Sequence, residues 1–215
     1  MGLKNNVFII ELTGVPCAGK SKAVASIALK YKARICDYNW LHKQLALDEL
    51  PLYLRASARE IYLFGYGIKI LGYRKFFVLF RAVWRSGWTF FRKLNVMRNV
   101  LAKYSIHFIA SSSCTGPIVI DEGISHLPFI FSTSKVECPE ELALYFPFGS
   151  PLVIKLDGQP ELIRQRLSER GHKMLSSYWT VDRFLKVNFQ TDIKQTLLFE
   201  NFLKSNFIKN YQPNV

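Results

Sequence analysis

A short segment that combines glycines with a lysine and a serine, TGVPCAGKS (13–21), is the part of this chain best suited to chemistry. Four residues separate Gly14 from Gly19, and Lys20 and Ser21 follow directly. Glycines at this spacing let a loop fold back so that successive backbone N–H groups point at phosphate oxygens. Lys20 would then bridge the β- and γ-phosphates of a nucleoside triphosphate, and Ser21 would offer its hydroxyl to Mg²⁺. The predicted phosphate-binding residues are Gly14, Val15, Pro16, Cys17, Ala18, Gly19, Lys20, Ser21 and Lys22.

The residues on either side of this loop support the same interpretation. The apolar run VFIIEL (7–12) is typical of a buried parallel strand, and residues 20–32 carry apolar side chains at helical spacing. The positive end of such a helix would face the same anion as the loop. The competing interpretation is a glycine turn followed by an unrelated Lys-Ser pair.

Further strands and helices alternate along the chain. PIVIDEG (117–123) and PLVIKLD (151–157) are predicted strands, and ARIC (33–36) is a weaker one. Helices are expected from Pro160 onwards and over residues 181–204. Strands that alternate with helices predict an α/β fold with a central parallel sheet covered on both faces.

Carboxylates close two of these strands. Asp121 ends PIVID, at the edge of a parallel sheet where ligands bind, and we expect it to hold Mg²⁺. Glu122 would orient a nucleophile or a metal-bound water, although Asp-Glu-Gly is also ordinary turn composition. Asp37 follows the weak strand and would accept a proton from an acceptor hydroxyl. The alternative for Asp37 is a helix N-cap.

Arginines gather in DGQPELIRQRLSERGHK (157–173), where Arg166 and Arg170 are four residues apart. Arginines that close over a transferred phosphoryl group stabilise its charge and exclude water. We therefore predict a lid-like helix over about residues 160–173. A surface helix with solvated arginines is the alternative.

The phosphate loop, the acidic strand end and the Arg-x-x-x-Arg-Gly helix, in this order, resemble the nucleotide-kinase branch of P-loop proteins. Thymidylate kinase and the deoxynucleoside kinases are the most similar in layout. The resemblance implies a P-loop NTPase three-layer sandwich that uses ATP and Mg²⁺ to phosphorylate a nucleoside, a nucleotide or a sugar-type acceptor. It also implies that Lys20, Asp121, Arg166 and Arg170 act in catalysis. The chain departs from thymidylate kinases at Glu122, where these have arginine, and SNFIKNYQPNV (205–215) is a poor candidate for a last strand.

A basic and aromatic segment, GYRKFFVLFRAVWRSGWTFFRKLNVMRNV (72–100), belongs to a mostly helical insertion expected over about residues 41–112. On one continuous helix Arg74, Arg81, Arg85 and Arg92 would lie nearly on one line, and Gly87 is a potential break. Three interpretations compete: an acceptor pocket made by Arg74, Arg81, Arg85 and Trp84, a helix on a membrane surface, or a mostly buried helix with solvated arginines.

Composition limits the alternatives. The chain has 215 residues and a formal net charge of +13, which suits one domain that attracts anions. The four cysteines form no CxxC pair, so we expect reduced thiols, and a disulfide pair is the alternative. We expect a cytoplasmic protein, with a membrane's inner face as a potential contact. Nucleic acid ranks low as a partner because no nucleic-acid fold is recognisable. The second candidate function is a non-catalytic nucleotide-binding switch, or an NTPase docked to a membrane or protein through 72–100.

Overall fold

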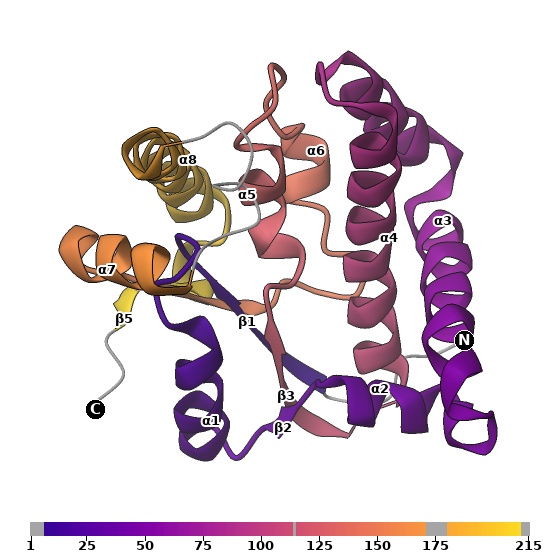
Figure 1. The fold of residues 1–215 in the computed structure, drawn as a ribbon. Helices are drawn as coiled ribbons and strands as arrows, with labels where there is room; N and C mark the ends of the chain where they lie inside the picture. Colours follow the sequence, from indigo (N-terminus) through magenta and orange to yellow (C-terminus); the bar gives the residue numbers. More distant parts are fainter. Residues whose placement is uncertain (1–6, 114, 171–179, 212–215) are drawn as a thin grey trace.

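The computed structural model describes residues 7–113, 115–170 and 180–211, and its centre is a five-stranded parallel sheet (Figure 1). The strands are β1 (Val7–Thr13), β2 (Arg34–Ile35), β3 (Gly116–Asp121), β4 (Leu152–Leu156) and β5 (Phe207–Tyr211). Their order in the sheet is β2-β3-β1-β4-β5, and every neighbouring pair is parallel. The predicted α/β fold with a central parallel sheet is confirmed. The expectation that residues 205–215 form no clear strand is wrong, because β5 pairs with β4.

The helices occupy the connections between the strands. They are α1 (Lys20–Lys30), α2 (Tyr38–Gln44), α3 (Leu52–Arg85), α4 (Phe90–Ser113), α5 (Leu127–Phe131), α6 (Glu140–Ala143), α7 (Pro160–Arg170) and α8 (Val181–Phe202). Three of them, α1, α7 and α8, coincide with helices predicted from the sequence.

Alternate residues of each strand pack on opposite faces of the sheet, as the pleat requires. Ile10, Leu12 and Val119 join α1 in one apolar cluster, whereas Ile9 and Ile118 pack with residues of α4 on the other face. On that second face α8 covers β4 through Phe199 and Val153. The sheet therefore lies between two layers of helices.

The insertion forms a pair of packed helices, α3 and α4. Gly67 of α3 approaches the Leu101 carbonyl of α4 so closely that a Cβ at this position would lie 2.5 Å from the oxygen. A kink at Gly72, where φ is 64°, divides α3 into two parts. Gly87, with a φ of 76°, lies in the turn between the helices. Gly87, the potential break in the sequence, thus separates Arg92 from Arg74, Arg81 and Arg85, and the four arginines do not lie along one continuous helix.

Three further expectations concern the chain as a whole. The end of the lid-like helix at Gly171 lies outside the described residues, as does the side chain of Arg170.

Cys17 and Cys138 are free thiols, whereas Cys114 is not described. No helix within the described ranges has both the length and the apolarity to cross a bilayer.

Candidate functional site

The glycine-rich loop connects β1 to α1 and requires its two glycines. A Cβ on Gly14, whose φ is 132°, would lie 2.5 Å from the Leu156 carbonyl oxygen of β4. Gly19 has a φ of 95° and is the N-cap of α1, where it provides no side chain to occupy the first N–H groups. The first turn of α1 also has no acidic residue. The start of α1 thus has backbone N–H donors with no capping side chain, which favours an anion there.

Lys20 is the first residue of α1 and is only 6% exposed. Its ammonium group donates hydrogen bonds to the carbonyl oxygens of Gly14 and Val15 at 3.1 and 3.2 Å. The same nitrogen lies 3.1 Å from Oε1 of Glu122. An ammonium group has three donors, so these three partners account for all of them and fix the lysine beneath the loop.

Asp121 lies next to the loop because of the sheet register. Leu12 of β1 pairs with Asp121 of β3, so the two strands end side by side. The Ser21 hydroxyl donates to Oδ2 of Asp121 over 3.3 Å. Burial and the neighbouring Glu122 raise the pKa of Asp121, whereas Lys20 and the Ser21 hydrogen bond oppose this. A hydroxyl and a carboxylate oxygen at this separation are suitable ligands for Mg²⁺, which prefers oxygen.

Glu122 adopts a backbone φ of 56°, which is uncommon for a residue with a side chain. Its carbonyl accepts a hydrogen bond from Lys103 of α4, and its carboxylate lies 3.6 Å from Nε2 of His126. Burial raises the pKa of Glu122, but His126, Lys20 and Lys103 outweigh it and lower this pKa to about 2. His126 is itself neutral at pH 7, because burial, Lys20 and Lys103 lower its pKa to about 3 against the effect of Glu122. The two lysines therefore supply the positive charge that keeps Glu122 ionised.

Glu11 shapes the turn that carries these carboxylates. It is fully buried in β1, and its carboxylate accepts the backbone N–H groups of Ile124 and Ser125 at 3.1 and 2.7 Å. A Cβ at Gly123 would lie 2.2 Å from Cδ of Glu11. Sequence reasoning missed Glu11, although a charged residue inside the apolar run VFIIEL was a visible signal.

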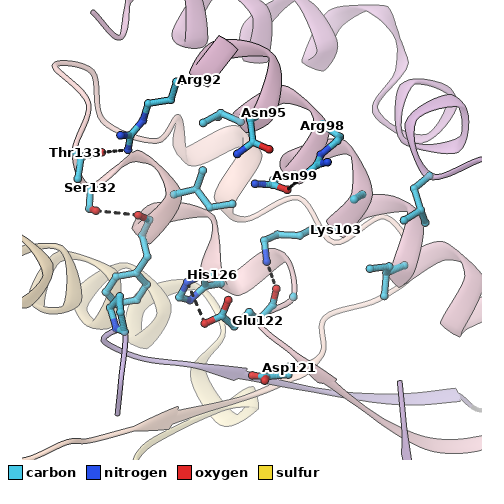
Figure 2. Close-up of a pocket in the computed structure, with 18 of the residues that line it drawn as sticks. Arg92, Asn95, Arg98, Asn99, Lys103, Asp121, Glu122, His126, Ser132 and Thr133 are labelled. Carbon is cyan, nitrogen blue, oxygen red and sulfur yellow. Dashed lines mark hydrogen bonds and ion pairs between the residues drawn. The ribbon is translucent and has the colours of Figure 1, made fainter. Parts of the chain in front are cut away.

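A cavity of about 860 Å³ adjoins Asp121 and Glu122 (Figure 2). One wall is a row of polar side chains on α4: Arg92, Asn95, Asn99 and Lys103. At the two ends of the row, Lys103 donates to the Glu122 carbonyl and Arg92 donates to the Thr133 hydroxyl. The row is extended by Arg59 and Arg98, and both lie within 4 Å of Glu60. Pro16 brings the glycine-rich loop to the same cavity. The remaining lining is largely apolar and includes Leu63, Phe91, Val96, Ile106, Phe129, Ile130 and Phe184.

The residues predicted to hold an acceptor do not line this cavity. Arg74, Arg81, Arg85 and Trp84 are exposed on the second part of α3. The cationic wall is instead formed by Arg92, Arg98 and Lys103 of α4, with Arg59 from the first part of α3. The α4 row has spacings of three, four and four residues, which is the signal in the sequence that would have identified it.

Asp37 and two arginines of α7 have partners that do not line the cavity. Asp37 is the N-cap of α2: its carboxylate accepts the Trp40 N–H at 2.7 Å, and it does not line the cavity. Arg166 donates from Nη1 to the Cys17 carbonyl at 3.0 Å, so α7 contacts the glycine-rich loop. Arg164 instead forms an exposed ion pair with Asp182 at 2.6 Å.

No model of a known protein family matches this chain, and a search of curated proteins finds no relative. The contacts around the glycine-rich loop, the strand-end carboxylates and the cavity therefore carry the functional interpretation.

Proposed function

We propose that this chain is a P-loop kinase that transfers a phosphoryl group from ATP, with Mg²⁺, to a small anionic acceptor. The observation that carries the proposal is the meeting of Lys20 and Glu122 between the glycine-rich loop and the cationic cavity. A donor site and an acceptor site would thereby share one edge of the sheet, at the carboxyl ends of its strands.

The loop is the proposed site for the triphosphate. Its backbone donors and the N-terminus of α1 would bind phosphate oxygens, and Lys20 would contact the transferred group. Ser21 and Asp121 would hold Mg²⁺, which, when bound, neutralises charge on the phosphates. Arg166 would stabilise charge from the α7 side, since it already reaches the loop at Cys17. Arg170 keeps its predicted role as a second lid arginine.

The cavity is the proposed site for the acceptor. Its volume falls within the about 300–1,000 Å³ that is common for small-molecule sites. Four cationic side chains, those of Arg59, Arg92, Arg98 and Lys103, line it against three carboxylates. Two of the carboxylates, Asp121 and Glu122, face the donor site, so the α4 wall favours an acceptor with its own negative charge.

Binding of the triphosphate would change the pKa of Glu122, and this change bears on its role toward the acceptor. A bound triphosphate competes with Glu122 for the ammonium group of Lys20, because that group has no further donor. A released Glu122 loses a nearby positive charge, so its pKa rises and it becomes a stronger base. This suits proton removal from a hydroxyl acceptor. A phosphate acceptor is already ionised and would not need the base.

The test is release of ADP from ATP·Mg²⁺ in the presence of nucleosides, nucleoside monophosphates and sugar phosphates, each assayed separately. Acceptor-dependent ADP release that falls by about 100-fold or more in Lys20→Ala supports the proposal. Lys30→Ala is the matched control, because Lys30 is exposed at the opposite end of the same helix and should retain activity. ATP binding without transfer to any acceptor would instead support the nucleotide-binding switch.

A further inference from the structure

The outer face of the second part of α3 carries two adjacent stripes of side chains. Aromatic residues recur at spacings of four, three and four, and arginines at seven and four. The aromatic stripe is Tyr73, Phe77, Phe80 and Trp84, and the arginine stripe is Arg74, Arg81 and Arg85. Tyr73 is 81% exposed, Phe77 63% and Trp84 43%, whereas Phe80 is half-buried and stacks on the Trp84 ring. The opposite face of this part of the helix is buried through Leu79, Ala82 and Val83.

The start of α4 extends the aromatic stripe. Phe90 is 58% exposed, Phe91 83% and Leu94 45%. The Lys93 ammonium lies 5.4 Å from the centre of the Trp84 ring, so the two helices form one surface. This surface, residues 73–94, is named here the aromatic-basic face. α3 lies outermost in the molecule, with α4 between it and the sheet (Figure 1).

The charged residues within this stretch of the sequence have a single sign. Between Glu60 and Asp121 the sequence holds nine lysines and arginines and no aspartate or glutamate. The solvent-facing side of a surface helix usually carries polar residues of both charges. A row of large exposed aromatic side chains on that side instead indicates an interaction surface. Aromatic side chains beside arginines suit the boundary between lipid headgroups and acyl chains, where each part meets a matching environment.

We propose that the aromatic-basic face docks this protein on the surface of a bilayer that contains anionic lipids. The aromatic stripe would enter the headgroup boundary, while the arginines bind the negatively charged headgroups. The protein would rest on the bilayer, because no helix in the described ranges can cross it. Phe91 also lines the cavity, so docking would hold one end of the cavity at the lipid surface. The inference does not depend on phosphoryl transfer.

The test is co-sedimentation of the full chain with vesicles of phosphatidylcholine alone or mixed with phosphatidylglycerol. We expect binding to the mixed vesicles only, and weaker binding at high salt. Arg81→Gln with Arg85→Gln should reduce the partition coefficient by about tenfold or more, from the attraction per basic residue. Lys32→Gln with Lys186→Gln removes the same charge from exposed positions elsewhere and should have a smaller effect.

A second pair of variants separates lipid docking from simple charge attraction. Phe77→Ser with Trp84→Ser should reduce vesicle binding, whereas Leu29→Ser with Ile193→Ser, which are also exposed apolar residues, should not. Wild-type tryptophan emission should shift to the blue on mixed vesicles, and this shift should diminish in Trp84→Phe. Equal binding to both kinds of vesicle, or no binding to either, would overturn the proposal. So would binding of a single-stranded oligonucleotide that depends on Phe77 and Trp84 while vesicle binding does not.

Discussion

Lys20 and Glu122 form an ion pair of 3.1 Å between the first residue of α1 and the turn that follows β3. Each partner is also held from a second side: Lys20 by two carbonyls of the loop, and Glu122 by Lys103 of α4. The pair thus connects the glycine-rich loop to the wall of the cavity. A ligand that displaces one partner must change the electrostatic environment of the other.

The arginines of α7 provide a matched test of the lid. Arg166→Ala removes the contact with the Cys17 carbonyl, and we expect a fall of about 100-fold in kcat if Arg166 stabilises the transferred phosphoryl group. Arg164→Ala removes an exposed ion pair with Asp182, so kcat should stay within about twofold of the wild type. Steady-state kinetics of both variants, with the best acceptor found, gives the comparison. Equal losses in both variants would contradict a specific role for Arg166.

Variants of Asp37 and Asp121 should have different effects, because we expect the Asp37 carboxylate to stabilise the fold and the Asp121 carboxylate to bind Mg²⁺. Asp37→Ala removes the N-cap of α2 and should lower the free energy of unfolding by about 1 kcal/mol, with transfer activity retained. Asp121→Asn removes the proposed magnesium ligand and should raise the Mg²⁺ concentration needed for half-maximal activity. Urea unfolding and magnesium titrations measure the two effects. Loss of activity in Asp37→Ala at unchanged stability would reinstate Asp37 as a base.

Gly123 should tolerate no side chain. The Cβ of Gly123→Ala would overlap the Glu11 carboxylate, and we expect a loss of about 3 kcal/mol in the free energy of unfolding. Gly65→Ala is the control, because a Cβ at this helical position has nothing within 4 Å. That variant should gain about 0.5–1 kcal/mol from helix propensity. Similar unfolding midpoints for both variants would contradict the packing of Glu11 against Gly123.

Stability should fall in acid because of His126 and Glu122. His126 has its pKa lowered from 6.5 to about 3, so its contribution is present above pH 6.5 and is lost as the pH falls toward 3. The pKa of Glu122 is lowered from 4.5 to about 2, so its contribution is lost at lower pH. Burial also lowers the pKa of His107, which acts in the same direction as His126.

Urea unfolding at pH 7.5, 6, 5 and 4 measures this dependence. The midpoint should decrease from pH 7.5 to 5, and His126→Gln should reduce that decrease without abolishing it, since His107 remains. A midpoint that stays constant or increases over this interval would show that His126 is not held neutral by its surroundings.

Much of the sheet could be predicted from the sequence because local patterns determine it. β1, β3 and β4 are short apolar runs, and glycines mark the turn before α1. β5 escaped prediction because it lies at an edge and pairs with β4 alone, so a polar sequence such as IKNY can form it.

The walls of the site were harder to predict because they depend on tertiary packing. The aromatic and arginine residues of α3 were prominent in the sequence, but they face outward. The less prominent row on α4, from Arg92 to Lys103, faces the cavity because the opposite side of α4 packs on α3 and the sheet. Periodicity shows that a helix has two faces, but which face meets the site follows from the position of its neighbours.

The central claim, that the glycine-rich loop binds a nucleoside triphosphate through Lys20, is tested most directly by calorimetric titration with ATP·Mg²⁺. Wild type, Lys20→Met and Lys30→Met should be compared after each is confirmed to be folded. We predict that the wild type binds, that Lys20→Met binds about 10- to 100-fold more weakly, and that Lys30→Met, at the exposed far end of α1, binds like the wild type. Equal affinity of Lys20→Met and the wild type, or no binding by the wild type, would contradict the account.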